Sequence, residues 1–150
     1  DLVVISPDVG GVKMARAYAK RLGADLGLTD KRRPRPDAVE IMNIIGDVRG
    51  KNAVLFDDVV TTARTLCQAA EAIREAGAKE IYAGVTHGVF SPGALERIGR
   101  SPIKELVITD TVHHDSVALP ANVTVLSVAN LLGEAVQRIH EERSLSSLFV

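Results

Sequence analysis

Short aliphatic segments alternate with amphipathic segments along this chain, and this alternation restricts the possible folds more than any other feature. The aliphatic segments have the length and composition of strands that are covered on both faces of a sheet. They are residues 2–6, 26–29, 38–46, 53–56, 81–86, 106–109 and 123–128. Apolar residues recur at helical spacing in segments 12–22, 66–76, 92–98 and 129–142. Strands that alternate with helices predict an α/β domain with a mainly parallel central sheet flanked by helices.

Length and composition narrow the classes of function. The 150 residues suffice for one domain, so we predict a single domain over residues 1–150. A net charge of -1 and the absence of Trp argue against nucleic acid as a partner. No apolar run approaches the ~20 residues of a membrane span, and no leader is visible, so we expect no membrane partner and a cytoplasmic location. The single cysteine, Cys67, excludes an intrachain disulfide and is expected to fill the core.

Polar residues follow the predicted strands at the edge where parallel sheets bind ligands. They include Asp8, the pair Asp57 and Asp58, His87 and Asp110. Because the carboxyl ends of parallel strands meet at one edge, we expect the ligand site there.

The segment VLFDDVVTTART at 54–65 is the most informative one. We predict a polar turn over 57–65 that leads from a buried strand into a helix. A helix N-terminus suits a phosphate, and Thr61, Thr62 and Thr65 add hydroxyl donors. Adjacent carboxylates at Asp57 and Asp58 can accept hydrogen bonds from a cis-diol or hold a divalent metal. The pattern therefore indicates a phosphorylated sugar. The alternative is a plain N-cap cluster in which Asp58 and Thr61 hold the loop.

Two further segments have the composition of anion sites. In SPDVGG at 6–11, Gly10 and Gly11 allow the backbone to approach an anion closely, although an ordinary strand–helix turn needs no more. In DKRRPRP at 30–36, four cations lie close together, and the two prolines prevent a helix. From the residues alone, this charged loop over 30–37 is better interpreted as a solvated basic loop or a patch for an acidic partner.

The histidines do not form an evident metal site. His87 follows a strand and is expected to pack or cap a turn rather than face a ligand. His113 and His114 with Asp115 are interpreted as a solvated turn, because no matching ligands are found elsewhere. His140 on the last helix is expected at the surface or in an interface.

The C-terminal segment is expected to cover apolar surface. Leu131, Leu132, Ala135 and Ile139 share one stripe of the predicted helix and are expected to face inward. The apolar tail at 145–150 (LSSLFV) is expected to be docked.

These motifs together resemble the ribose-phosphate pyrophosphokinases, also called phosphoribosyl pyrophosphate synthetases. The matching segments lie in family order: SPDVGGV, DKRRPRP, MNIIGDVRGK, FDDVVTTART, THGVFS and RIHEERSLSSLF. The resemblance implies a phosphoribosyltransferase (type I)-like fold and covers only the C-terminal half of a longer two-domain enzyme. A missing N-terminal half would explain why the chain starts at Asp1, directly before a strand, although trimming would produce the same start.

The resemblance implies a reaction and its catalytic groups. The family transfers pyrophosphate from ATP to the C1 hydroxyl of ribose 5-phosphate, a kinase-type transferase step in nucleotide biosynthesis. Residues Asp8, Val9, Gly10 and Gly11 would form the pyrophosphate loop, with Asp8 holding Mg²⁺. The basic loop would be the flexible catalytic loop. Its Lys31 and Arg33 would stabilise the transferring phosphates, with Arg33 also contacting the sugar phosphate.

The resemblance also implies a ribose 5-phosphate site. Asp57 and Asp58 would bind the ribose hydroxyls. The 5-phosphate would lie on Thr61, Thr62, Ala63, Arg64 and Thr65. Most members read D-T-A-G-T where this chain reads T-T-A-R-T, so Thr61 replaces an acid and Arg64 replaces glycine. If that glycine position requires a positive φ, Arg64 would cost about 1–2 kcal/mol. Arg64 could instead supply a guanidinium to the phosphate.

Partners and competing functions follow from the same resemblance. ATP, ribose 5-phosphate, the N-terminal half-domain and a homo-oligomer (hexamers built from dimers in the family) are implied, and the 150-residue chain alone is expected to be inactive. A nucleobase phosphoribosyltransferase shares the two-aspartate loop, but the basic loop and SLSSLF do not belong to that class. The remaining alternative is a non-catalytic regulatory homologue or assembly module, in which Arg64 marks a lost substrate site.

Overall fold

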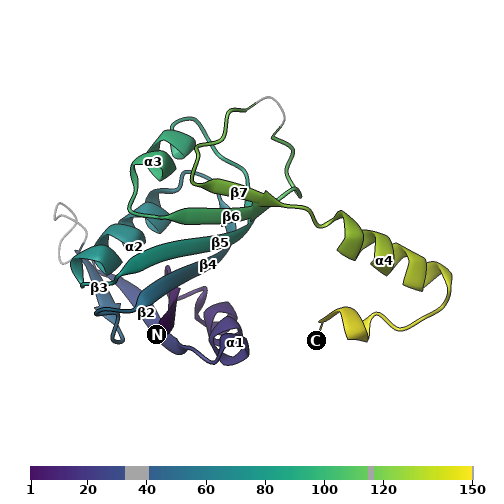
Figure 1. Ribbon diagram of the computed structural model, residues 1–150, viewed down its shortest axis with the longest axis horizontal. Coiled ribbons are helices and arrows are strands. Elements are labelled where there is room, and N and C mark those ends of the chain that lie inside the picture. The colour runs from purple at the N-terminus through teal and green to yellow at the C-terminus, as the bar shows by residue number, and fades with distance from the viewer. Residues whose placement is uncertain (33–40, 115–116, 150) are drawn as a thin grey trace.

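One seven-stranded sheet forms the centre of the molecule, and the computed structural model describes residues 1–32, 41–114 and 117–149 (Figure 1). The strand order is β3-β2-β1-β4-β5-β6-β7. The strands are β1 (Leu2–Ser6), β2 (Asp25–Arg32), β3 (Ile41–Ile45), β4 (Asn52–Val60), β5 (Glu80–Gly88), β6 (Glu105–Thr109) and β7 (Val123–Leu126). Strand β3 runs antiparallel to β2, and every other neighbouring pair is parallel. The predicted mainly parallel α/β fold is therefore confirmed.

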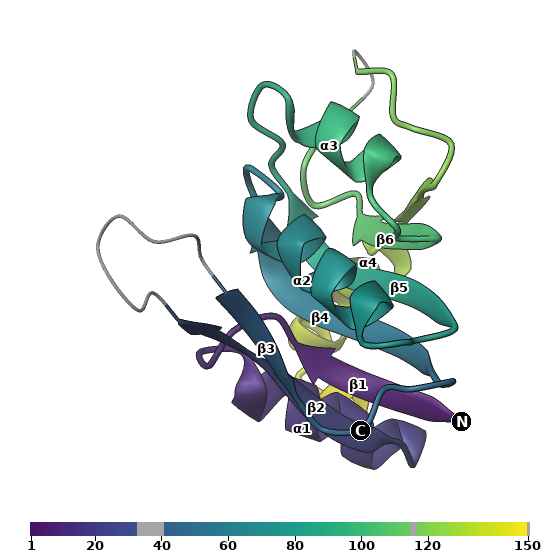
Figure 2. The same ribbon diagram turned by 90° about the vertical axis from the view of Figure 1, so that its left-hand side faces the viewer.

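Helices cover both faces of the sheet. The covering helices are α1 (Val12–Leu22), α2 (Arg64–Glu75) and α3 (Ala94–Arg100). Helix α4 (Ala129–His140) and the 3₁₀ helix η1 (Ser146–Phe149) follow the last strand. Figures 1 and 2 show α1 on one face of the sheet, and α2 and α3 on the other. Within the described residues, no helix combines the length and the apolar character that crossing a membrane requires.

The larger core lies between the sheet and the pair α2 and α3. Its fully buried side chains include Ile5, Leu55, Ile73, Ile98 and Leu106. Cys67 of α2 is also buried there, as predicted, and burial raises the pKa of its thiol above the usual value.

A smaller core lies between the sheet and α1. It contains Val4, Ala15 and Ala19, and Val54 and Phe56 pack against it. Helix α1 ends at Gly23, whose φ of 59° is the left-handed conformation that commonly terminates a helix. Strands β1 and β4 therefore bury side chains on both faces, which explains their continuous aliphatic sequences.

Strands β2 and β4 are longer than the sequence predicts. Strand β4 continues to Val60, so Asp57 and Asp58 belong to the strand and not to a turn. Its pairing with β5 extends to Val60 opposite Gly88 and satisfies the backbone there. Strand β2 continues to Arg32 because it pairs with β3, whereas a loop was predicted from residue 30. The remainder of the predicted basic loop, 33–37, and the start of the predicted strand 38–46 lie outside the described residues.

Helix α4 forms where predicted, but its apolar stripe does not face inward. It projects away from the sheet (Figure 1), and none of its residues is buried. Leu131, Leu132 and Ile139 are 50%, 57% and 62% exposed, and Ala135 is half-buried. The prediction was wrong because periodicity identifies which residues share a face but not what the face packs against.

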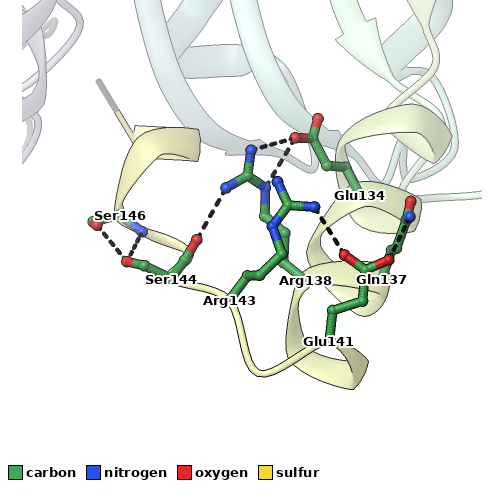
Figure 3. Close-up of polar contacts among 7 residues, drawn as sticks. All are labelled: Glu134, Gln137, Arg138, Glu141, Arg143, Ser144 and Ser146. Carbon is green, nitrogen blue, oxygen red and sulfur yellow. Dashed lines mark hydrogen bonds and ion pairs between the residues drawn. The ribbon is translucent and has the colours of Figure 1, made fainter.

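The tail after α4 folds back through polar contacts (Figure 3). Arg138 pairs with Glu134 one turn earlier and donates to the carbonyl of Ser144 at 3.1 Å. Arg21 of α1 donates to the carbonyl of Phe149 at 3.2 Å, but the Phe149 side chain is 74% exposed. The tail therefore contacts α1, with Leu145 and Leu148 half-buried and no residue of η1 fully buried.

Candidate functional site

A small cavity lies at the carboxyl ends of β1 and β4, at the edge where the sequence predicts the ligand site. Its volume is about 190 Å³. Asp8, Asp57 and the continuous segment 59–66 line it. The structure therefore brings Asp8 together with Asp57 and with the threonine-rich loop. Among the described residues, Val9, Gly10, Gly11 and Asp58 do not line the cavity itself.

The loop that enters α2 turns at Ala63. This residue has a φ of 58°, a left-handed conformation that costs a non-glycine residue about 1–2 kcal/mol. Arg64 is the first residue of α2 and does not have a positive φ. Arg64 therefore does not occupy a position that requires a positive φ, because the left-handed position falls on the preceding alanine. The exposed Arg64 side chain remains beside the cavity.

Most backbone N–H groups of this loop have no acceptor among the residues that the structure describes. Within residues 1–32, 41–114 and 117–149, no hydrogen bond is donated by the N–H of Thr61, Thr62, Ala63 or Thr65. The N–H of Arg64 lies 3.4 Å from its only acceptor there, the Thr62 hydroxyl. No side chain caps α2, so the alternative of an N-cap cluster built by Asp58 and Thr61 is wrong. Unpaired N–H groups at a helix start form an anion-binding arrangement.

Two carboxylate residues, Asp8 and Asp57, also line the cavity. Asp57 is half-buried, and its Oδ1 accepts a hydrogen bond from the N–H of Asp58 at 3.0 Å. Burial raises the pKa of Asp57 from 3.8 to about 6, and the nearby Asp58 and Asp8 add to this shift. Among the described residues, the neighbours that act on Asp57 are therefore other carboxylates and the backbone of Asp58.

This carboxylate set fits a hard divalent cation that also binds a substrate. The Asp8 and Asp57 side chains line one cavity and act on each other electrostatically. The described part of the chain contains no group of three or more His, Cys, Asp or Glu that could form a complete cage. One or two carboxylates with water and phosphate oxygens are the usual ligands of Mg²⁺. The residues present therefore fit Mg²⁺ held jointly with a phosphorylated ligand.

Buried hydroxyls hold the turn that carries Asp8. The Thr29 hydroxyl contacts the carbonyls of Ser6 and Pro7 at 3.2 and 2.5 Å, and the Ser6 hydroxyl donates to the carbonyl of Asp8 at 2.6 Å. The Asp8 Oδ1 accepts a hydrogen bond from the N–H of Gly11 at 2.8 Å. A Cβ on Gly11 would lie 2.8 Å from the Ser6 hydroxyl, so this position requires glycine for space. Sequence analysis missed Thr29, because a single hydroxyl in a strand belongs to no motif. Ser6 begins the segment SPDVGG, but its role in holding the turn was not predicted.

The predicted catalytic loop is only partly described. The backbone of Lys31 lies in β2, in register with Met42 of β3. The Lys31 side chain and all of Arg33 lie outside the described residues, so their predicted roles stay predictions.

The histidines lie away from the cavity. His87 Nδ1 is 2.8 Å from the Thr111 hydroxyl, which joins the ends of β5 and β6 and agrees with the predicted turn role. His114 is half-buried and its ring lies 5.3 Å from that of Phe90, so only His113 of this pair is exposed. Asp115 is outside the described residues, and His140 is exposed.

Comparison with known proteins identifies the family. Residues 29–150 match the model of the phosphoribosyl synthetase-associated domain. The chain belongs to this family. This family match agrees with the resemblance to phosphoribosyl pyrophosphate synthetases that the sequence motifs indicate.

Similar proteins carry related names. The chain is 52% identical over 149 residues to a ribose-phosphate pyrophosphokinase of Thermotoga maritima, covering 99% of the chain and 47% of that protein. It is 54% identical over 149 residues to the protein of the same name from Oceanobacillus iheyensis, with 99% and 47% covered. The chain therefore spans about half the length of the curated relatives that it matches.

Solved structures give the same result for the fold. Phosphoribosylpyrophosphate synthetase from Mycobacterium smegmatis superposes with a TM-score of 0.86 at 35% identity, covering 95% of this chain and 46% of that one. Orotate phosphoribosyltransferase from Aeropyrum pernix superposes with a TM-score of 0.58 at 22% identity, covering 88% of this chain and 65% of that one. The second likeness concerns the fold alone, and it confirms the predicted phosphoribosyltransferase-like class.

Proposed function

We propose that this chain is the ribose 5-phosphate-binding half of a ribose-phosphate pyrophosphokinase. In this reaction the C1 hydroxyl oxygen of ribose 5-phosphate attacks the β-phosphorus of ATP. The bond between that phosphorus and the AMP oxygen breaks, the hydroxyl proton leaves to water, and phosphoribosyl pyrophosphate and AMP form. The names of the similar proteins support this proposal, and so does the chemistry of the cavity.

The observation that carries the proposal is the row of unpaired N–H groups beside two carboxylates. The N–H groups of residues 61–65 and the threonine hydroxyls suit the 5-phosphate, because they offer donors and no negative charge. The adjacent Asp57 and Asp58 offer acceptors for the two ribose hydroxyls. Arg64, which lines the same cavity, would add a cation to the phosphate side.

The turn at Asp8 would face the second substrate. We assign Asp8, Val9, Gly10 and Gly11 to the pyrophosphate, since the glycines permit a close approach of the backbone. Mg²⁺ bound by Asp8, with Asp57 nearby, would supply charge neutralisation for the transferred phosphates. Asp8 would keep its orientation through the Gly11 N–H, and Thr29 would hold the turn beneath it.

The basic segment would supply the remaining positive charge. Lys31 and Arg33 would lie against the transferring phosphates, with Arg33 also near the sugar phosphate. Transfer of a phosphoryl-type group depends mainly on positioning and electrostatic stabilisation. These two cations would contribute by stabilising the negative charge on the transferring phosphates.

The remainder of the assembly is part of the same proposal. We assign residues 1–150 to one domain that works with a second half of the enzyme in a cytoplasmic homo-oligomer. The second half would complete the ATP site, so the 150-residue chain alone should bind ribose 5-phosphate but transfer pyrophosphate negligibly.

Calorimetric titration of the 150-residue chain tests the sugar-phosphate assignment. Ribose 5-phosphate should give saturable heat, ribose should give none, and inorganic phosphate should bind more weakly. Asp57→Asn should weaken binding of ribose 5-phosphate without weakening that of inorganic phosphate. Asp110→Asn, which follows β6 and does not line the cavity, is the matched control and should change neither. The absence of saturable heat with ribose 5-phosphate would instead favour a non-catalytic homologue.

A further inference from the structure

Three successive carbonyls of the β4–α2 loop are held from one side by residues that follow β5. The carbonyl of Val60 accepts hydrogen bonds from the N–H groups of Val89 and Phe90, at 2.9 and 3.3 Å. The carbonyl of Thr61 accepts from the N–H and the hydroxyl of Ser91, at 2.9 and 3.2 Å. The left-handed φ of 45° at Phe90 turns this segment toward the loop.

The third carbonyl is held by a charged side chain. Nη1 of Arg97 in α3 donates to the carbonyl of Thr62 at 2.5 Å. Arg97 is half-buried, and none of the described carboxylates forms an ion pair with it. The next arginine of the helix, Arg100, differs in both respects, since it is exposed and pairs with Glu96 at 2.8 Å.

The planarity of the peptide bond links these contacts to the cavity. In a trans peptide, the carbonyl of one residue and the N–H of the next point in opposite directions. The carbonyls held by residues 89–91 and by Arg97 therefore turn the N–H groups of residues 61–63 away from these donors. Residues 61–63 line the cavity, Ser91 and Arg97 do not, and these N–H groups have no acceptor among the described residues.

We propose that Arg97 is a positioning residue that fixes the peptide plane between Thr62 and Ala63, so that the Ala63 N–H points at the bound phosphoryl group. The inference rests on the proposed ribose 5-phosphate site and adds a residue from outside the cavity. A guanidinium on a carbonyl also polarises the peptide, which makes its N–H a better donor. The left-handed conformation of Ala63 persists only if neighbouring contacts hold it, and Arg97 supplies such a contact.

The test compares three variants of the full chain. Arg97→Ala removes the donor, Arg97→Lys keeps the charge and one donor direction, and Arg100→Ala is the control on the same helix. Ribose 5-phosphate affinity is measured by calorimetry, melting temperature by circular dichroism, and the Ala63 amide by proton–nitrogen NMR during titration. We expect Arg97→Ala to bind about tenfold more weakly, which corresponds to about 1.4 kcal/mol. Arg97→Lys should recover most of the affinity, and Arg100→Ala should match the wild type.

The NMR signal separates positioning from general stability. In the wild type the Ala63 amide proton should move downfield as ribose 5-phosphate binds, and in Arg97→Ala this movement should be lost even where the melting temperature is kept. If the wild type binds ribose 5-phosphate and Arg97→Ala keeps both the affinity and the Ala63 response of the wild type, this inference is overturned. The proposed function is then left intact. An equal loss of affinity in Arg100→Ala also overturns it. A wild type that binds no ribose 5-phosphate overturns the proposed function, and the inference with it.

Discussion

Within the candidate site, Asp57 is the single residue whose ionisation the fold changes most clearly. Its pKa is raised to about 6, chiefly by burial and further by its neighbours Asp58 and Asp8. Between the unfolded pKa near 3.8 and the folded value near 6, the folded protein binds more protons than the unfolded one. This carboxyl therefore lowers stability as the pH rises through that window.

Substitution of Asp57 tests this electrostatic cost. Asp57→Asn should raise the melting temperature at pH 8 and change it little at pH 4, because only the charged form is penalised. The gain should stay below about 1 kcal/mol, since the half-exposed carboxyl is screened by water. Asp25→Asn is a control of opposite sign, because a hydrogen bond from Lys51 holds the pKa of Asp25 below its usual value. If Asp57→Asn were less stable than the wild type at pH 8, the raised pKa of Asp57 in the folded protein would be contradicted.

The conformations of Ala63 and Arg64 give a second test at the residue scale. Arg64→Gly should lower the free energy of unfolding by up to about 1 kcal/mol, because glycine is unfavourable in a helix and gains nothing at a negative φ. Ala63→Gly should cost less, since its left-handed φ suits glycine. Urea denaturation measures both. Stabilisation by Arg64→Gly would show that the left-handed position lies at residue 64.

At the scale of elements, the segment between β5 and α3 supports the loop between β4 and α2. Its residues Val89, Phe90 and Ser91 donate to loop carbonyls, and the Phe90 ring packs over Gly88. The support depends on close packing at the end of β5. A Cβ on Gly88 would lie 2.8 Å from the Phe90 ring and 3.0 Å from Ile108 Cδ1.

Two glycine-to-alanine substitutions distinguish the effect of close packing at Gly88 on stability from the general effect of replacing glycine by alanine. Gly88→Ala should destabilise the protein by about 1–3 kcal/mol, because ring and strand must shift. Gly99→Ala, in α3, meets only Pro120 at 3.6 Å and should be neutral or stabilising by up to about 1 kcal/mol. Thermal denaturation compares them. If both substitutions changed the melting temperature equally, the segment around Phe90 would be able to shift at little cost and would not support the loop.

At the scale of the whole molecule, the chain consists of a packed sheet with three covering helices and an outlying α4. Leu106 is fully buried in the sheet, whereas Leu132 on α4 is 57% exposed. The sheet and helices α1 to α3 should therefore account for most of the stability of this chain, and α4 for little.

A pair of leucine substitutions measures this difference in the 150-residue chain. Leu106→Ala should cost about 2–5 kcal/mol, because it leaves a cavity in the core. Leu132→Gln should change stability by less than about 0.5 kcal/mol, as expected for a surface position. A large loss on Leu132→Gln would show that α4 packs against the domain.

The sequence predicts the fold well where local pattern and tertiary packing agree. The parallel sheet, α1, and the meeting of Asp8 with Asp57 follow from aliphatic strands whose carboxyl ends share one edge. The extension of β4 through Asp57 and Asp58 could not be predicted, because its backbone is satisfied by the distant β5. Arg97 escaped prediction for a similar reason, since it contacts a backbone carbonyl of a distant loop and belongs to no motif. Ser91 lies in the segment THGVFS, but the sequence does not indicate that it contacts the carbonyl of Thr61.

The most direct test of the central claim is a crystal structure of this chain with ribose 5-phosphate. We predict that the phosphoryl oxygens lie within hydrogen-bonding distance of the N–H groups of residues 61–65, with the ribose hydroxyls on Asp57 and Asp58. A loop that keeps its conformation but leaves the cavity empty at saturating ligand, or a phosphate bound elsewhere, would contradict the account.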